Sequence, residues 1–293
     1  MKRILLLGKN GQVGWELHRA LLPLGELIAL DAPELDFTNF DLLRRQVQDA
    51  QPDVIVNAVA YTAVDQAENQ PDLAMTINAT APGLLAELAC KMKAVMVHYS
   101  TDYVYDGTKG SPYVEEDLPN PLGVYAKSKL AGDQAIMNVG GAAVILRSSW
   151  IYSNRRDNFI KKVLTWAHTR TEVSVVQDQV GCPTWARALA ECTAQVLSER
   201  NASLWEWAIE RRGVYHLAGD GYCSRYEWAQ EILKMDPHPD EQTIRALNPA
   251  QTAEFPTPAQ RPLYTALDCG YFYRTFGLCL PDWRTSLALA MDD

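Results

Sequence analysis

The sequence lacks the residue spacings that hold transition metals. None of its six cysteines stands in a C-x-x-C pair, and its five histidines form no H-E-x-x-H motif. Because zinc sites draw on such closely spaced ligands, no transition-metal site is expected. The cysteines are interpreted instead as mostly core residues of a protein in a reducing compartment. They are Cys90, Cys182, Cys192, Cys223, Cys269 and Cys279.

Positive charge and long apolar runs are scarce as well. The chain has 27 Lys and Arg against 36 Asp and Glu, and its pI is near 5.1. A nucleic-acid-binding protein carries a basic face, so no nucleic-acid partner is expected. No stretch approaches the ~20 apolar residues of a membrane span, and the apolar run after the basic start is too brief for a signal peptide. The sequence therefore predicts a cytoplasmic protein without a membrane partner.

Short apolar runs alternate with helical patterns in the first half of the 293 residues. The runs are apolar throughout, as expected for strands that are covered on both faces of a sheet. This order predicts an α/β protein with a Rossmann-type, doubly wound parallel sheet. The expected strands are residues 3–8, 26–31, 53–60, 94–100 and 142–150.

The second half is less regular. Two segments, EVSVVQ and GVYHLAG, have the composition of strands that return to a sheet, whereas proline and aromatic residues become frequent from about residue 220. Ligands of such sheets bind in the crevice at the carboxyl ends of the strands, where a smaller lobe is expected to pack. We predict a dinucleotide-binding domain over 1–150, with 173–219 returning to it, and a smaller C-terminal substrate-binding lobe made mainly of 151–172 and 220–293.

The first expected strand ends in the loop GKNGQVG, which leads directly into a helical pattern. Gly8, Gly11 and Gly14 permit a tight turn and let backbone N–H groups approach a pyrophosphate. The N-terminus of the helix adds a partial positive charge. The spacing is G-x-x-G-x-x-G, but its place between a strand and a helix makes the motif informative. It predicts a dinucleotide site.

Asp31 ends the second expected strand, 20 residues after Gly11. A carboxylate there can accept hydrogen bonds from the adenosine ribose hydroxyls, which favours NADH over NADPH. Lys9 and Arg3 could soften this preference. A turn residue without contact to a ligand is the alternative.

A second group of polar residues begins where the fourth expected strand ends. Thr101 and Asp102 follow that strand, at the edge of the sheet where the reactive end of the cofactor is expected. Tyr125 and Lys129 are four residues apart, which puts both on one face of a helix. A phenol titrates near ~10, and a nearby cation lowers that pKa. The Tyr–Lys pair is either an acid–base device or an ordinary surface turn of a helix.

Taken together, these motifs resemble the extended short-chain dehydrogenase/reductase superfamily, and more closely the dTDP-4-dehydrorhamnose reductase family. The resemblance runs nearly end to end, in order and spacing. It is carried by GKNGQVGWEL, DVIVNAVAYTAVDQAE, VHYSTDYVYDG, YAKSKLAG, RSSWIY and PTPAQRP. The resemblance implies reduction of the C4 ketone of dTDP-4-dehydro-6-deoxy-L-mannose to dTDP-L-rhamnose, a precursor of surface polysaccharide, with NADH or NADPH as the cofactor.

The resemblance also implies roles for individual residues. Tyr125 would protonate the ketone oxygen, Lys129 would hold the nicotinamide ribose and lower the pKa of Tyr125, and Thr101 would hydrogen-bond the same oxygen. The expected cofactor-binding residues are Gly8, Asn10, Gly11, Gln12, Val13, Gly14, Asp31, Asp36, Phe37, Ala60, Tyr61, Thr62, Tyr99, Tyr125 and Lys129.

The substrate-binding residues that the resemblance implies include the catalytic Thr101 and Tyr125. Beyond these, Asp102 would contact the sugar, Trp150 would pack on the deoxysugar ring, and Arg261 would bind the nucleotide phosphates. Each has a structural alternative. Asp102 could cap a turn, Trp150 could be a core residue, and Arg261 could be an ordinary surface residue. Tyr99 is likewise more often core than contact.

Three alternatives compete with this reductase. Sugar dehydratases of the same superfamily carry Thr-Asp-Glu at the position of Thr101-Asp102-Tyr103, so the missing glutamate favours simple reduction. A reductase of another nucleotide 4-keto sugar is an alternative. So is a non-catalytic NAD(P)-binding regulatory subunit, although such a subunit has no need of Thr101, Tyr125 and Lys129 together.

Some members of the family dimerise through a magnesium site. Glu16 matches its first ligand, but Arg187 and Ala188 stand where the later acidic pair would be needed. A hard divalent ion wants oxygen ligands, so magnesium binding is doubtful. Arg187 could instead pair with Glu16 of a partner subunit. A monomer or a homodimer is expected.

Overall fold

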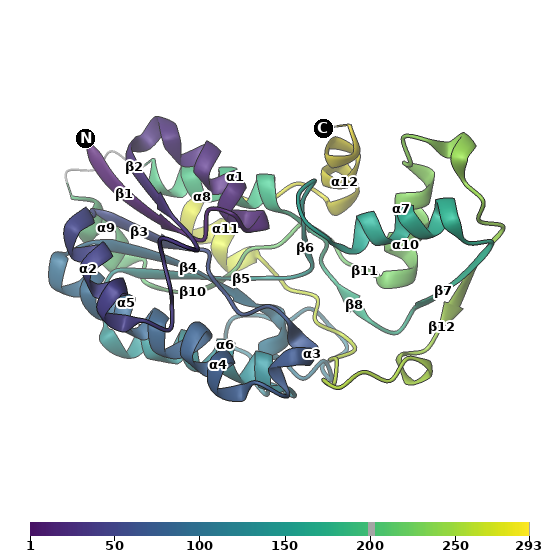
Figure 1. Ribbon diagram of the computed structural model, residues 1–293, viewed down its shortest axis with the longest axis horizontal. Helices are drawn as coiled ribbons and strands as arrows, with labels where there is room; N and C mark the ends of the chain where they lie inside the picture. The colour runs from purple at the N-terminus through teal and green to yellow at the C-terminus, as the bar shows by residue number, and fades with distance from the viewer. Residues whose placement is uncertain (199–202, 293) are drawn as a thin grey trace.

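The computed structural model describes residues 1–198 and 203–292. Its centre is a parallel sheet with the strand order β10-β5-β4-β3-β1-β2 (Figure 1). The order reverses beside β1, because β2 lies on one side of β1 and β3 on the other. The predicted doubly wound α/β sheet is therefore confirmed. Its strands are β1 (Lys2–Leu7), β2 (Gly25–Leu30), β3 (Val54–Asn57), β4 (Val95–Thr101), β5 (Ala143–Ser148) and β10 (Gly213–His216).

Both faces of this sheet are buried, because successive side chains of a strand point to opposite faces. In β1, Ile4 and Leu6 belong to one apolar core, and Leu5 and Leu7 to another. Helices cover the two faces (Figure 1). The first core is closed by α1 (Gln12–Leu21), α8 (Ala186–Leu197), α9 (Leu204–Glu210) and α11 (Gly270–Phe276), and the second by α2 (Phe40–Ala50), α5 (Ala81–Met92) and α6 (Val124–Val139).

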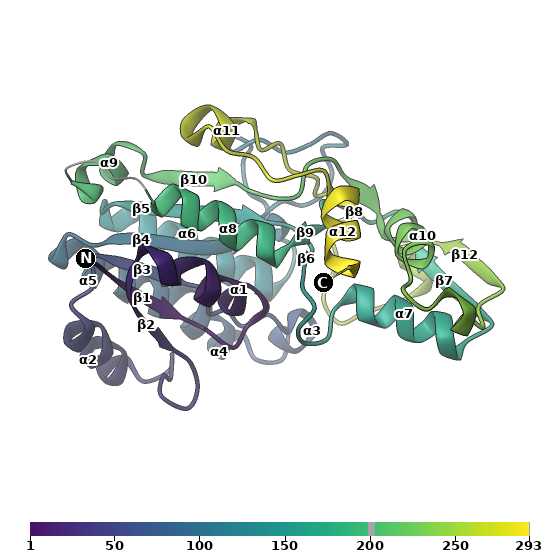
Figure 2. The ribbon, with the colours of Figure 1, turned by 90° about the horizontal axis from the view of Figure 1, so that it is seen from above.

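A smaller lobe stands at one end of the molecule in both ribbon views (Figures 1 and 2). Its own core contains Ile160, Val173, Trp228 and Leu287. Its main elements are α7 (Phe159–Thr169), β7 (Glu172–Val176), α10 (Arg225–Lys234), β12 (Ala246–Ala250) and α12 (Trp283–Met291). Two short helices, α3 (Val64–Ala67) and α4 (Pro71–Met75), pack on α6 in the main domain. The remaining short strands of the molecule are β6 (Ile151–Tyr152), β8 (Val180–Gly181), β9 (Thr184–Trp185) and β11 (Cys223–Ser224).

The two segments predicted as later strands belong to different sheets. GVYHLAG enters the main sheet as β10, beside β5. The prediction that EVSVVQ also returns to that sheet is corrected, because β7 pairs with β12 in the smaller lobe. The physical reason is visible in its burial pattern. Glu172 and Ser174 are exposed while Val173 and Val175 are buried, the alternation of a strand with one face in water.

The segment Pro71–Met92 comprises α4, a π-helical turn (Thr76–Thr80) and α5. By length and composition alone it is apolar enough to cross a membrane. However, 56% of its most apolar window is buried inside the protein. Its burial matches that of a core helix packed against a sheet.

Candidate active site

The glycine loop makes a turn that larger residues would block at two positions. Gly8 has a φ of +92°, a backbone conformation that favours glycine. A Cβ on Gly14 would lie 1.8 Å from the carbonyl oxygen of Gly8, so α1 packs directly against the turn. Gly11 is the N-cap of α1. The first backbone N–H groups of a helix point out of its N-terminal end and have no partner within the helix. This is the geometry that a dinucleotide pyrophosphate requires.

A cavity of about 660 Å³ lies over this loop. Its lining includes eight of the residues that were expected to bind the cofactor, which come from four separate segments. They are Gly11, Gln12, Val13, Ala60, Thr62, Tyr99, Tyr125 and Lys129. Sequence reasoning missed Ala58, Ser100, Ile151, Arg156 and Asp157, which also line it. Arg156 donates from Nε to the carbonyl of Asn10 at 2.9 Å, so it ties the start of the smaller lobe to the glycine loop.

Asp31 ties the glycine loop to the end of β2. Its Oδ2 accepts the backbone N–H of Asn10 at 2.8 Å, and its Oδ1 accepts that of Ala32 at 2.8 Å. A carboxylate has further lone pairs, so these bonds leave room for ribose hydroxyls. Asp31 therefore has a structural role beside the cofactor role predicted for it.

Asp31→Ala should weaken NADH binding by on the order of 10-fold and NADPH binding less. The carboxylate can bond a free ribose hydroxyl, whereas it repels a 2′-phosphate. Affinity titrations with both cofactors measure this, with Asp31→Asn as the control that keeps an acceptor for Asn10. Equal losses for both cofactors would show that Asp31 acts only through the loop.

The neighbouring pair Asp36 and Phe37 face different ways. Asp36 is exposed, and its carboxylate accepts two bonds from Thr38, from the backbone N–H at 2.8 Å and the hydroxyl at 2.7 Å. These bonds hold the pKa of Asp36 below its usual value. The side chain of Phe37 is buried in the core beneath the sheet. A cofactor contact of either residue stays a prediction.

Asn78, which sequence reasoning missed, holds the Ala60–Thr62 loop in place. It is fully buried in the π-helical turn, a feature frequent at functional sites. Its Oδ1 accepts the backbone N–H of Tyr61 at 2.8 Å, and its Nδ2 donates to the Tyr61 carbonyl and, at 2.9 Å, to Ser128 Oγ. Since Ser128 lies on α6, Asn78 joins the loop to the helix that carries Tyr125 and Lys129. A lone asparagine in an apolar helical run was the available signal.

Lys129 is almost completely buried, with 1% of its surface exposed. Its Nζ donates to the carbonyl of Tyr99 at 2.6 Å and lies 3.2 Å from Nε2 of His98. Burial lowers the pKa of Lys129 to about 8, although the charge of Asp133 opposes the shift. The side chain of Tyr99 points the other way, into the core, where its hydroxyl meets Thr193 Oγ1 at 2.8 Å. Tyr99 thus supplies a carbonyl to this site.

Tyr125 differs from one expectation. Its pKa is raised above the ordinary value, chiefly by burial, with a hydrogen bond from Thr101 opposing the shift. The predicted lowering of this pKa by Lys129 is not seen, because the Lys129 amine is turned toward Tyr99 and His98. An ordinary phenol already holds its proton at neutral pH, and the raised pKa extends this to more alkaline pH. The protonated form is the one that a proton donor needs.

Lys129→Met should change how stability depends on alkaline pH. Since the folded pKa of Lys129 is about 8 and its ordinary value is 10.5, the unfolded chain binds more protons between them. The free energy of unfolding therefore rises with pH in that window. Below the window, the buried ammonium lowers the free energy of unfolding by its full amount. Between pH 7 and pH 9 the wild type should gain about 1 kcal/mol over the variant. Urea unfolding of the wild type and of the variant at both pH values measures this gain. If the wild type and the variant differ in their free energy of unfolding by the same amount at pH 7 and at pH 9, the prediction is wrong.

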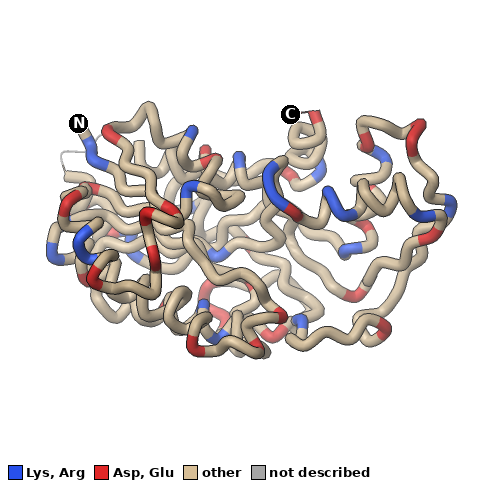
Figure 3. The backbone as a smooth tube through the Cα atoms, in the orientation of Figure 1, with Lys and Arg blue, Asp and Glu red and all other residues tan. Residues whose placement is uncertain are grey.

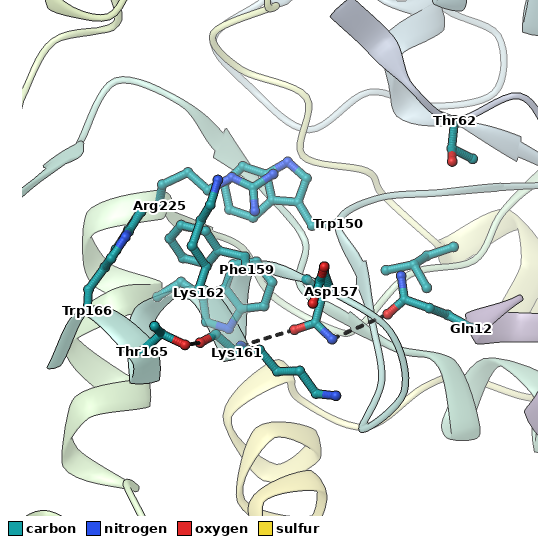
Figure 4. Close-up of a pocket in the computed structure, with 13 residues that line it drawn as sticks. Gln12, Thr62, Trp150, Asp157, Phe159, Lys161, Lys162, Thr165, Trp166 and Arg225 are labelled. Carbon is teal, nitrogen blue, oxygen red and sulfur yellow. Dashed lines mark hydrogen bonds between the residues drawn. The ribbon is translucent and has the colours of Figure 1, made fainter. Parts of the chain in front are cut away.

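Only some of the residues expected to bind substrate line a large cavity. Trp150 lines a second cavity of about 690 Å³ (Figure 4). Asp102, by contrast, is 2% exposed, and its carboxylate accepts bonds from three hydroxyls, those of Thr101, Ser149 and Thr265. It ties the end of β4 to β5 and to the C-terminal segment. A contact of Asp102 with sugar stays a prediction.

Arg261 was expected to bind phosphate, but its Nη2 donates to Oδ2 of Asp65 at 2.7 Å. Neither of the two large cavities has Arg261 in its lining. The basic side chains of the second cavity are instead Lys161, Lys162 and Arg225. No motif in the sequence signalled them, because α7 and α10 come together only in the fold. The two cavities share Gln12, Thr62, Ile151 and Asp157, so they form one continuous cleft.

Glu16 and Arg187 meet within one chain, with Nε 3.4 Å from Oε2, and Arg19 lies 3.5 Å from the same oxygen. Over residues 1–198 and 203–292, no three His, Cys, Asp or Glu side chains form a metal-binding group. The expectations for magnesium and for the oligomeric state stay predictions.

Comparison with known proteins identifies the family of this chain. The family model described as the RmlD substrate binding domain matches residues 1–293. The dTDP-4-dehydrorhamnose reductase of Burkholderia thailandensis is 40% identical over 298 residues, which cover 99% of this chain and 98% of that protein. A solved structure of a dTDP-4-dehydrorhamnose reductase from Clostridium acetobutylicum has a TM-score of 0.89 and 35% identity, and covers 99% of this chain and 98% of that one.

A second solved structure is that of dTDP-4-dehydrorhamnose reductase from Bacillus anthracis in complex with NADP. It has a TM-score of 0.88 and 33% identity, and covers 99% of both chains. The family model matches the whole length of the chain, and the solved structures share its fold. This chain belongs to the RmlD substrate binding domain family.

Proposed function

We propose that this protein reduces the C4 ketone of dTDP-4-dehydro-6-deoxy-L-mannose to dTDP-L-rhamnose with NADPH or NADH. The observation that carries the proposal is the Tyr125 phenol, which lines a cleft that continues from the glycine loop to Trp150. Family membership supports the substrate class, because the relatives reported above are named dTDP-4-dehydrorhamnose reductase.

The residues around the loop fit a nicotinamide dinucleotide. The turn at Gly8 and Gly14 leaves the N-terminus of α1 open to a pyrophosphate, and Asp31 stands at the end of β2 for the adenosine ribose. Lys129, held by the Tyr99 carbonyl, would hold the nicotinamide ribose. When bound, the cofactor supplies the hydride that adds to C4 of the sugar.

Tyr125 would then deliver its phenolic proton to the oxygen at C4. A phenol is protonated through the neutral range, so this proton is available there. Thr101 would orient the same oxygen, and its hydroxyl is itself fixed, since it accepts the N–H of Tyr103 at 3.2 Å and lies 3.2 Å from Asp102. Asp102 therefore positions Thr101 through a bond that the structure contains.

The test is NADPH and NADH oxidation, followed at their absorbance band, with the keto sugar generated in situ from its precursor. Oxidation coupled to formation of dTDP-L-rhamnose is the expected result. Cofactor binding without oxidation would refute the proposal, and a panel of other nucleotide 4-keto sugars would then separate a reductase of another sugar from a non-catalytic binding subunit.

A further inference from the structure

A row of buried hydrogen bonds leads from Lys129 into the main sheet. Nε2 of His98 lies 3.2 Å from Nζ of Lys129, and Nδ1 of the same ring lies 3.1 Å from Nδ2 of Asn57. His98 and Asn57 are opposite each other on the neighbouring strands β4 and β3, and both are fully buried. Oδ1 of Asn57 accepts the backbone N–H of Val59 at 3.1 Å. The row therefore ends at the loop after β3, which borders the cofactor cavity.

The amide of Asn57 determines which nitrogen of His98 carries the proton. Because Oδ1 accepts the Val59 N–H, the amide presents Nδ2 to the ring, and an amide nitrogen only donates. Nδ1 of His98 must then accept, so the proton of the neutral ring is on Nε2, which faces Lys129. The ring is neutral because burial and the charge of Lys129 hold the pKa of His98 well below its usual value.

Lys129 can accept a bond from this ring only as an uncharged amine. An amine has one lone pair, whereas an ammonium has three N–H donors and no acceptor. The amine can accept the Nε2–H of His98, donate to the Tyr99 carbonyl at 2.6 Å and keep one N–H for the cavity. An ammonium would face the Nε2–H with an N–H of its own, and two buried donors without an acceptor are costly.

The charged form of Lys129 requires the opposite arrangement. His98 would carry its proton on Nδ1 and accept from the ammonium at Nε2. The Asn57 amide would turn over, so that its Oδ1 accepts the Nδ1–H of the ring. The backbone N–H of Val59 would then lose its acceptor, and the loop beside the cofactor would feel the change.

The charges around Lys129 leave both forms within reach. Asp133 on the same helix favours the ammonium, but its Oδ2 is already paired with Nε of Arg147 on β5 at 3.0 Å. The pKa of Tyr125, also on this helix, is raised by burial, so this phenol stays uncharged. Strands β3 and β4 contain no Lys, Arg, Asp or Glu, and Figure 3 shows few charged positions along the main sheet. Since burial lowers the pKa of Lys129 to about 8, its charge changes within the stable range of pH.

We propose that Asn57 and His98 are positioning residues that couple the charge of Lys129 to the loop beside the cofactor. When Lys129 is an amine, His98 carries its proton on Nε2 and Asn57 binds Val59. When Lys129 is an ammonium, His98 carries its proton on Nδ1 and Asn57 turns away from Val59. The change takes up one proton from water in all, and the ring is neutral in both forms. The link to the cofactor rests on the proposed function, in which Lys129 holds the nicotinamide ribose.

Nitrogen-15 spectra of the histidine-labelled wild type test this coupling. The signals of His98, assigned by their loss in His98→Gln, should show the proton on Nε2 above about pH 9 and on Nδ1 below about pH 7. The midpoint should follow the pKa of Lys129. The same tautomer at both ends of this range would overturn the proposal. So would a switch that persists in Lys129→Met, because that variant has no charge to gain.

The chain contains a matched control in His216, which is also fully buried. Its Nδ1 lies 3.1 Å from the carbonyl of Tyr113 and 3.2 Å from that of Asp268, and its Nε2 lies 2.8 Å from the hydroxyl of Tyr105. A carbonyl only accepts, so His216 should keep its proton on Nδ1 over the whole range. A tautomer change in His216 at the same pH would mean that the cause is not Lys129, and would overturn the proposal.

The affinity for NADP tests the link to the cofactor. In the wild type it should fall on the order of 5-fold from about pH 7 to about pH 9, because a charged donor binds a hydroxyl more strongly than an amine does. Asn57→Asp should remove most of this fall, since a carboxylate accepts both the Val59 N–H and the Nδ1–H of His98 and so keeps Lys129 charged. Lys129→Met should bind NADP equally at both pH values.

Two outcomes of these titrations would overturn the link, an affinity of the wild type that does not change with pH and a full fall in Asn57→Asp. If Asn57→Asp does not fold, the spectra of the wild type decide the coupling without it. None of these readouts needs turnover. A tautomer switch of His98 in a protein that does not reduce the keto sugar would therefore refute the proposed function and leave the coupling standing.

Discussion

Replacing Tyr125 by Phe should lower kcat for ketone reduction by ~10²–10⁴-fold, the usual contribution of a positioned general acid. The substitution removes one hydroxyl and keeps the ring that packs on Tyr103. Cofactor affinity should be unchanged, because Lys129 is held by Tyr99 and His98 rather than by the phenol. Steady-state rates and an NADP titration of the same preparation measure both quantities.

Tyr103→Phe is the matched control for this result. It removes a hydroxyl from the ring beside Tyr125 and should change kcat by less than about tenfold, since that hydroxyl has no place in the proton transfer. Turnover near the wild-type rate in Tyr125→Phe would remove Tyr125 from the mechanism. An equal loss in both variants would indicate damage to the packing instead.

Arg147→Met should lower the free energy of unfolding by about 3–5 kcal/mol, the cost of leaving one charge of a buried pair alone. Arg147 is 4% and Asp133 2% exposed, and their Nε and Oδ2 atoms are 3.0 Å apart. Arg147 also donates to the hydroxyl of Tyr105 at 2.9 Å, which in turn meets Nε2 of His216 at 2.8 Å. The substitution would leave the buried Asp133 carboxylate on α6 without its ion-pair partner.

Two controls sharpen this prediction. Arg44→Met breaks an exposed pair with Asp41 and should cost at most about 1 kcal/mol. The double variant Arg147→Met with Asp133→Leu removes both charges and should recover much of the loss, since a buried pair and an apolar pair are often of similar stability. Urea unfolding with an unchanged m-value measures all three. A cost for Arg147→Met no greater than that for Arg44→Met would contradict the role of the pair.

The features that could be predicted from the sequence are local. Apolar runs of strand length predicted the positions of β1 to β5, and glycines between a strand and a helix predicted the cofactor loop, because both depend on backbone conformation over a few residues. The four-residue spacing of Tyr125 and Lys129 placed them on one face of α6 for the same reason. The resemblance of the motifs indicated the family.

The features that could not be predicted depend on contacts between segments far apart in the sequence. Asn78 reaches Tyr61 and Ser128, Arg261 meets Asp65, and Arg225 stacks on Trp150, 75 positions earlier in the chain. The pKa of Tyr125 likewise follows from burial and not from its spacing to Lys129. Sequence periodicity states which face of an element is buried, whereas the partner on that face, and hence the charge and hydrogen bonds around each side chain, is settled only when the layers pack.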